Sequence, residues 1–363
     1  MTDLLYSEEE EALRSAVRDL LTDRCGAASV LSRAETAEPH DRELWKALAD
    51  GMGLAGLLVP EELGGQGATH REAAVVLEEL GRAVAPVPYL TSAVVATETL
   101  LACEGEAARE LLAALASGRR IGVLALPLSH ATQNFGSAVR EEGGALRGRV
   151  TGVADAAVAD VLLVPTGTGL FAVDAADSGV DIAPQTSLDL TRPLAAVTFD
   201  GARARALTPD AAPALARGLR AGAALLASEQ LGVAEWCLTE TVRYVKERHQ
   251  FNRPVGSFQA LKHRLAQLWL EVVNTRAAAR HAADALAAGS DEPNLAAALA
   301  QAYAAPVAVR AAEEALQLHG GIGMTWEHPV HLYLKRAKAD SIAYGTAGRH
   351  REALAELVEL PAP

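Results

Sequence analysis

The feature that most limits the fold of this chain is a set of long Ala- and Leu-rich segments in its C-terminal part. Segments from about Asp210 to Arg248, Ser257 to Ala288 and Pro293 to His319 are rich in strong helix formers. Shorter helices are expected around residues 329–338 and 348–358. Several helices joined by short loops predict a helical bundle.

The first two thirds of the chain predict two further regions. Ser7-Glu8-Glu9-Glu10 resembles a capping box, and helices are expected near 42–51, 70–81, 91–103 and 106–116. Short apolar runs bounded by turn residues then predict strands near 121–126, 161–165, 170–173 and 195–199. The predicted class is α+β, mostly α. It has a helical domain over 1–118, a small β domain over 119–205 and a helical bundle over 206–363.

Composition narrows the function classes. The formal charge of −13 weighs against binding the phosphate backbone of nucleic acid. Three scattered cysteines give neither a disulfide framework nor a metal spacing, which favours the cytoplasm. No signal peptide is visible, no uncharged apolar run reaches about 18 residues, and no membrane span or metal site is predicted.

Two motifs interrupt the long helices. The first is Arg248-His249-Gln250-Phe251-Asn252-Arg253-Pro254-Val255-Gly256-Ser257-Phe258-Gln259, and the second is Gln317-Leu318-His319-Gly320-Gly321-Ile322-Gly323-Met324. Taken singly, the arginines are explained as solvated charges at a helix end. The glycines alone are explained as a helix C-cap and turn. The two motifs together, followed by Trp326-Glu327-His328-Pro329, resemble the acyl-CoA dehydrogenase family over nearly the whole chain. The segment His331–Ala337 resembles most the actinobacterial branch associated with steroid degradation.

This resemblance implies FAD and an acyl-CoA substrate. It places Arg248 on the pyrophosphate of an FAD held mainly by a neighbouring subunit, where a guanidinium suits phosphate oxygens. It places Phe251 at the adenine or flavin edge with Gln259 nearby. Asn252 stands where the family has Gly, and it tolerates a left-handed backbone. The same cofactor would contact four other residues: Gln317, Gly320, Gly321 and Thr346.

The expected catalytic base is replaced. The family places Glu before a Gly-Thr pair, but this chain has Tyr344. A phenol is a poor base at neutral pH, although the Tyr344 backbone N–H could polarise a thioester carbonyl. An alternative position in the family falls within 217–223, which contains no acid. Glu229 and Glu235 lie further along that helix and are interpreted as structural polar residues.

The β domain is altered as well. Leu126–Ala131 replaces the family's flavin-contacting loop, and Gly152-Val153-Ala154 replaces its Trp-x-Thr/Ser element. The resulting hypothesis is one subunit of an α2β2 acyl-CoA dehydrogenase, clamping a partner's FAD in trans. One alternative for the assembly is a homo-oligomer. Two alternatives for the function are a flavin-dependent oxygenase of the same fold and a non-catalytic, flavin-free scaffold.

Overall fold

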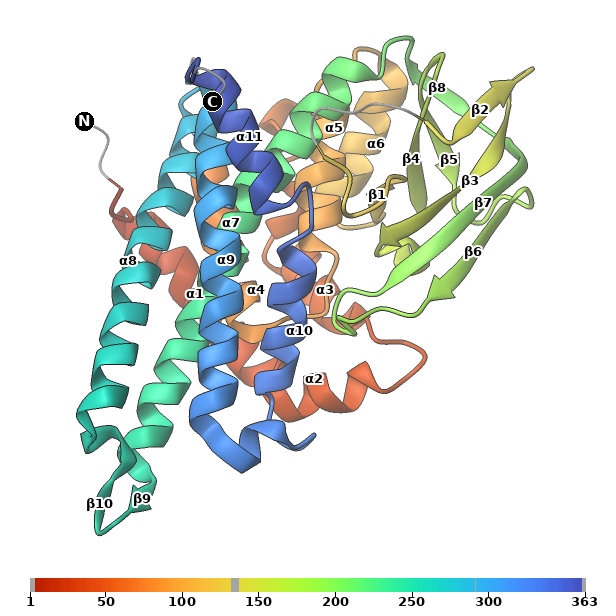
Figure 1. Ribbon diagram of the computed structural model, residues 1–363. Coiled ribbons are helices and arrows are strands. Elements are labelled where there is room, and N and C mark those ends of the chain that lie inside the picture. Colours follow the sequence, from red (N-terminus) through yellow and green to blue (C-terminus); the bar gives the residue numbers. More distant parts are fainter. Residues whose placement is uncertain (1–3, 132–136, 291, 361–363) are drawn as a thin grey trace.

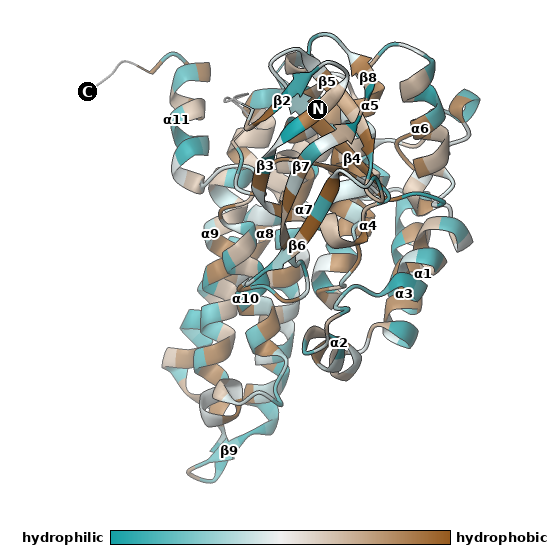
Figure 2. Ribbon diagram, turned by 90° about the vertical axis from the view of Figure 1, so that its right-hand side faces the viewer, coloured by the Kyte–Doolittle hydropathy of each residue, from teal (hydrophilic) through white to brown (hydrophobic). Residues whose placement is uncertain are grey.

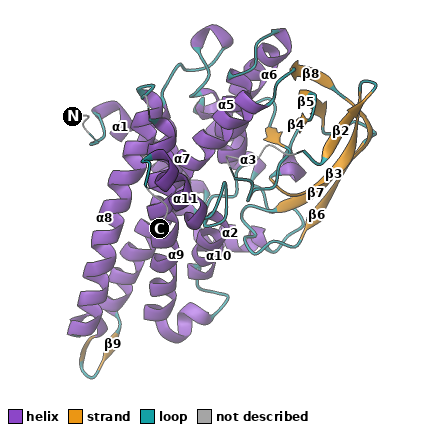
Figure 3. Ribbon diagram, turned by 45° about the horizontal axis from the view of Figure 1, so that its top comes forward, coloured by secondary structure: helices purple, strands orange, loops and turns teal. Residues whose placement is uncertain are grey.

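The computed structural model describes residues 4–131, 137–290 and 292–360. Helices occupy most of the molecule, and the strands gather at one side of it (Figures 1 and 3). The N-terminal helical elements are α1 (Glu8–Arg24), α2 (Ala27–Ala34), α3 (Arg42–Lys46), η1 (Ala47–Gly51), η2 (Leu54–Gly56), η3 (Glu61–Leu63), α4 (His70–Ala83), η4 (Tyr89–Ala96), α5 (Thr97–Leu101) and α6 (Glu106–Ala116).

Helix starts in this region are set by capping. The Ser7 and Glu10 side chains form the predicted capping box at the start of α1, and Thr69 and Glu72 form another at α4. α4 then packs closely on α7 (Ala212–Glu247). A Cβ built on Gly232 of α7 would lie 2.0 Å from the Glu78 carbonyl oxygen, so this approach requires glycine.

The β region contains two four-stranded sheets. One has the order β1-β4-β5-β8 and the other β2-β3-β7-β6, and only β1 and β4 pair in parallel among the strands of these sheets. The strands are β1 (Gly122–Leu124), β2 (Val139–Glu142), β3 (Ala145–Ala154), β4 (Val161–Thr166), β5 (Gly169–Asp174), β6 (Val180–Gln185), β7 (Leu194–Arg203) and β8 (Arg205–Thr208), with η5 (Ala156–Val158) between β3 and β4.

Long helices form the C-terminal bundle. They are α7, α8 (Gln259–Ala287), α9 (Pro293–His319), α10 (Val330–Asp340) and α11 (Ala347–Leu357), with the short hairpin β9 (His249–Gln250) and β10 (Arg253–Pro254), η6 (Val255–Ser257) and η7 (Gly320–Met324). α7 contacts α4, α8 and α9 and is largely buried. Hydrophobic residues concentrate on α7, α4 and the inner strands, whereas the β9–β10 hairpin is hydrophilic (Figure 2).

One helical stretch, Pro293–Met324, is long and apolar enough to span a bilayer by length and composition. However, 67% of its apolar window is buried inside the fold, between the other bundle helices. That burial is the pattern of a core helix of a folded domain.

The predicted class and the order of helices, strands and helices are confirmed, with local differences. Residues 89–96 form a π-helical segment before α5, where one helix over 91–103 was predicted. The sequence also gave no sign of α2. In the two four-stranded sheets, β2, β3, β6 and β8 were missed, because their exposed faces carry Arg, Glu, Asp and Gln and their apolar runs are short.

Candidate functional site

The first motif forms the end of α7 and the hairpin that follows it. Arg248 caps the helix in an extended conformation, and β9 and β10 pair as antiparallel strands. Phe251 and Asn252 form the turn with φ angles of 53° and 59°. The left-handed backbone expected at Asn252 is therefore present. The Phe251 ring is 85% exposed, apart from an edge contact to Phe258 at a centroid distance of 6.2 Å.

The two motifs meet at a cavity of about 350 Å³. It is lined by Arg248 and Gln250 from one motif, Gly320 and Gly321 from the other, and Tyr244 beside them. Arg248 is exposed and has no carboxylate within ion-pair distance among the described residues. We call the five residues Arg248, Phe251, Gln317, Gly320 and Gly321 the clamp.

The clamp glycines leave open space. Gly320 has a φ of 61°, and a Cβ added at Gly320 or Gly321 would find no heavy atom within 4 Å. A ligand phosphate can therefore approach the backbone closely there. Gly320 also ends α9, so the helix-cap interpretation of this motif is correct too. Gln317 is exposed one turn earlier, and Gln259 is exposed as the first residue of α8.

Tyr344 lies in a different place, between the bundle and the β region. Its φ of 53° is unusual for a tyrosine, and two contacts hold its peptide. Its backbone N–H donates to the Leu128 carbonyl at 2.8 Å, and His350 Nε2 donates to the Tyr344 carbonyl at 3.1 Å. The Tyr344 N–H is thus satisfied within the chain. The expectation that it could polarise a thioester carbonyl is wrong for this conformation.

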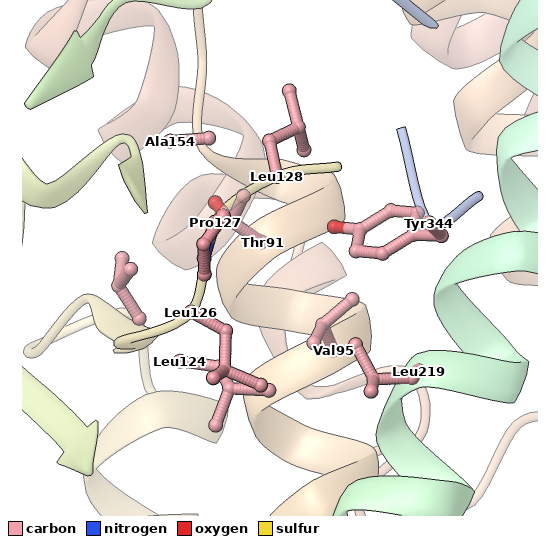
Figure 4. A pocket seen from close by; sticks show the side chains of 10 residues that line it. Thr91, Val95, Leu124, Leu126, Pro127, Leu128, Ala154, Leu219 and Tyr344 are labelled. Carbon is pink, nitrogen blue, oxygen red and sulfur yellow. The ribbon is translucent and has the colours of Figure 1, made fainter. Parts of the chain in front are cut away.

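The Tyr344 ring fills an apolar cavity. Figure 4 shows the ring reaching toward Pro127 and Thr91, beside Leu128 and Leu219. The volume that remains is about 20 Å³, which is room for about one water molecule. Behind the ring, a Cβ on Gly222 would lie 3.2 Å from the ring carbons and 2.8 Å from Val95 Cγ2, so a larger residue would require these side chains to shift.

The altered β-domain segments close the same cavity. The Leu128 N–H donates to the Gly152 carbonyl at 2.8 Å, while the Leu128 carbonyl accepts from Tyr344. Ala154 lines the cavity wall. Leu128 therefore ties the predicted flavin-facing loop both to β3 and to the Tyr344 loop. Thr346, two residues later, caps α11 by accepting from the Arg349 N–H at 3.3 Å.

None of the described residues that line this cavity carries a carboxylate or an imidazole that could act as the catalytic base. Burial raises the pKa of the Tyr344 phenol, which strengthens the expectation that it is not a base. Burial alone would also raise the pKa of Glu229, but Arg192 and Arg336 outweigh it and hold that pKa below its usual range. Glu235 pairs with Arg276 at 2.6 Å and with Arg82.

Glu229 belongs to a buried charge cluster that the sequence did not suggest. Arg336 donates to Asp189 and Glu229, each at 2.6 Å, and Arg192 donates to Glu229 at 2.6 Å and Asp340 at 2.8 Å. The cluster joins the loop before β7 to α7 and α10. Glu229 and Glu235 are therefore structural residues, as predicted.

The structure brings together only part of the predicted set. Arg248, Gly320 and Gly321 share a cavity, with Gln317, Phe251 and Gln259 on adjoining elements. Tyr344 and Thr346 lie elsewhere. Gly222, against the Tyr344 ring, and Arg248 are 26 residues apart on one helix, which corresponds to about 39 Å along its axis. Figure 1 shows α11 and the β9–β10 hairpin toward opposite ends of α7.

Sequence reasoning missed Gly222 and Leu128, the residues that hold Tyr344 in place. A signal was present for Gly222, because a glycine inside a helix lowers helix stability and often marks a close approach. The sequence contained no such signal for Leu128, because its contacts are made by its backbone N–H and carbonyl.

Comparison with known proteins agrees with this fold. Family models for the acyl-CoA dehydrogenase N-terminal domain and C-terminal domain match residues 7–119 and 213–358. The chain therefore belongs to the acyl-CoA dehydrogenase family, the oxidoreductases whose cofactor is FAD, as in a Mycobacterium smegmatis glutaryl-CoA dehydrogenase solved with FADH2.

Three relatives are similar over most of their length. Acyl-CoA dehydrogenase IpdE2 of Mycobacterium tuberculosis is 37% identical over 330 residues, covering 91% of both chains. A chain of the ChsE4-ChsE5 complex from Mycobacterium tuberculosis is 31% identical, with a TM-score of 0.87 and coverage of 99% and 100%. A chain of the Tcur3481-Tcur3483 steroid acyl-CoA dehydrogenase is 32% identical, with a TM-score of 0.86 and coverage of 97% and 98%.

Proposed function

We propose that this chain is one subunit of a heteromeric, FAD-dependent acyl-CoA dehydrogenase, in which it supplies the clamp for a partner's FAD and no catalytic base. The observation that carries this proposal is the separation of clamp and cavity on α7. At about 39 Å along the helix, one dinucleotide cannot contact Arg248 and Tyr344 of the same chain. This separation supports a clamp that serves a cofactor seated on another subunit.

The clamp fits the phosphates of a dinucleotide. Among the described residues no carboxylate pairs with Arg248. Its guanidinium lies beside open glycine backbone, so it offers bidentate donors to an anionic oxygen while Gly320 and Gly321 admit that oxygen closely. Gln317 and Gln259 add neutral donors on exposed helix turns, and Phe251 offers an exposed ring for stacking. Thr346 lies near Tyr344, away from the clamp, and its hydroxyl caps α11, so we assign it no contact with the partner's FAD.

The chain's own cavity does not fit a flavin ring or an acyl group. A bound FAD would supply the hydride acceptor for the β-carbon of the acyl group, and a base would be needed for the α-proton. Here Tyr344 occupies the cavity, its phenol keeps its proton, and Leu128 closes the β-domain side. A partner of the same family would supply the flavin-binding cavity and the glutamate. This closure weighs against the oxygenase alternative, and the open clamp weighs against a scaffold without flavin.

We infer the substrate class from the relatives. IpdE2 is named an acyl-CoA dehydrogenase and the Tcur3481-Tcur3483 protein is named a steroid acyl-CoA dehydrogenase, so we propose a bulky steroid-derived acyl-CoA, handled in the cytoplasm. The ChsE4-ChsE5 complex is a two-component relative, which supports the α2β2 arrangement.

The test is the flavin content of the chain co-purified with its partner subunit. Arg248→Ala should lower flavin per assembly at least fivefold, because a charge-assisted phosphate contact is lost. Lys246→Ala is the matched control, since it removes an exposed cation from the same helix end on another face.

Two results would overturn the proposal. One is unchanged flavin in the Arg248→Ala assembly. The other is a chain that binds about one FAD per subunit when purified alone, which would require Tyr344 to leave its cavity.

A further inference from the structure

A second group of polar side chains adjoins the clamp, and one of them, His319, lines the same cavity. Glu240 is on α7, His319 is the last residue of α9, and His328 lies in the loop before α10. Their ligand atoms all lie within 4.8 Å of one another. Across residues 4–131, 137–290 and 292–360, no other three His, Cys, Asp or Glu side chains meet this spacing. The ends of α7, α9 and α10 come together in this part of the molecule (Figure 1).

His319 is prepared as a ligand. Its Nδ1 lies 2.7 Å from the Ala315 carbonyl, so Nδ1 carries the proton and Nε2 carries the lone pair. The residue is only 2% exposed, and Nε2 is buried without a hydrogen-bond partner among the described residues. A buried nitrogen without a partner is costly, and a carbonyl bond to the other nitrogen is how proteins orient metal-binding histidines.

His328 and Glu240 lie beside His319. The His319 and His328 rings lie 4.4 Å apart between centroids and are inclined by 47°, and one ligand atom from each of the three side chains lies within 4.8 Å of the others. Coordination through His328 Nε2 would place the proton on Nδ1 and give up one long contact, at 3.3 Å, from the Val330 N–H. Both Glu240 oxygens accept from Arg243, one of them from Nε at 3.0 Å, so coordination would replace one of these two bonds while the other is kept.

We propose that Glu240, His319 and His328 form a binding site for a divalent transition-metal ion, with Zn²⁺ as the best match. Two imidazoles and one carboxylate are ligands that Zn²⁺ accepts, and they leave a fourth position for water. The ion would join α7 to the end of α9 and to the loop before α10. Because His319 directly precedes Gly320, it would also fix the backbone of the clamp.

The test uses the full chain purified with its partner, stripped with a chelator and dialysed. Zn²⁺ is titrated in competition with a chromophoric chelator, and metal content is counted by mass spectrometry. The proposal expects one Zn²⁺ per copy of this chain. His328→Ala and Glu240→Gln should each weaken binding at least tenfold, whereas His281→Ala, an exposed histidine on α8, should leave it unchanged.

A further readout does not depend on variants that fold poorly. Co²⁺ bound to the wild-type protein should show the visible absorption of a four-coordinate site, and Zn²⁺ should displace it. A stoichiometry far below one, or affinity that neither His328→Ala nor Glu240→Gln changes, would mean an adventitious ion only and would overturn the proposal.

Discussion

The buried cluster around Arg336 allows a quantitative prediction. Arg336 is 2% exposed and donates to Asp189, Glu229 and Thr191, each at 2.6 Å. Replacing it with methionine, Arg336→Met, keeps most of the volume but leaves three buried carboxyl groups, on Asp189, Glu229 and Asp340, facing Arg192 alone. Removing one partner of a buried ion pair costs about 3–5 kcal/mol, and we expect that loss in the free energy of unfolding at pH 7.5.

The loss should depend on pH with a definite sign. Burial opposes ionisation of Asp189 and Glu229, but the arginines hold both pKa values below their usual range in the folded wild-type protein. Their stabilisation is therefore present above the unfolded pKa of about 4 and is lost as the pH falls through the lower folded values. Without Arg336, burial raises these pKa values, so the variant's deficit should shrink between pH 7.5 and pH 5.

The assay is urea unfolding followed by tryptophan fluorescence, at pH 7.5 and pH 5 and at one fixed protein concentration, since assembly shifts apparent stability. Arg205→Met is the control, because Arg205 is half exposed and pairs with an exposed Glu110; it should cost less than about 1 kcal/mol. A deficit below about 1 kcal/mol for Arg336→Met at pH 7.5, or an equal deficit at both pH values, would refute the reasoning.

Three further outcomes are expected. Gly232→Ala should lower the unfolding free energy by about 1–3 kcal/mol in the same assay, because its Cβ would meet the Glu78 carbonyl at 2.0 Å, whereas Gly26→Ala, with nothing within 4 Å, should be nearly neutral. Asn252→Val puts a β-branched residue at a φ of 59° and should reduce flavin in the mixed assembly, while Asn252→Gly should retain it; equal flavin in both would exclude a role for this turn. Thiol titration at pH 8 should detect no fast-reacting cysteine in the native chain and three after denaturation. Burial raises the pKa of the Cys25 thiol to about 12 and that of Cys103 to about 11, and it raises the pKa of Cys237 as well. Rapid labelling of the native chain would contradict the burial of these three cysteines.

The sequence predicted the long helices well because their pattern extends over many turns. α7, α9 and α11 begin and end within about two residues of the expected positions. It predicted the β region less well: the short runs in β4 and β5 were found, but β2 and β6 were missed, because edge strands with polar faces carry little hydrophobic signal.

The parts of the site that depend on side-chain identity could be predicted from the sequence, whereas the parts that depend on backbone contacts could not. Arg248, Gly320 and Gly321 were recognised from their motifs, and the structure places them on one cavity. That Tyr344 blocks its cavity depends on space left by Gly222 and on hydrogen bonds made by the Leu128 peptide, and no residue pattern encodes those backbone bonds. The charge cluster around Arg336 draws its members from three distant segments, so only folding brings them together.

The continuity of α7 has a consequence for partner choice. Every residue inserted between Gly222 and Arg248 would move Arg248 by about 1.5 Å and turn it by about 100° around the helix. A change of one or two residues would swing the guanidinium to another side of the bundle, whereas seven would nearly restore its direction, about 10 Å further along. The length of α7 therefore sets the direction in which Arg248 points around the helix axis. Two subunits can share a cofactor only if their α7 helices point this residue in matching directions.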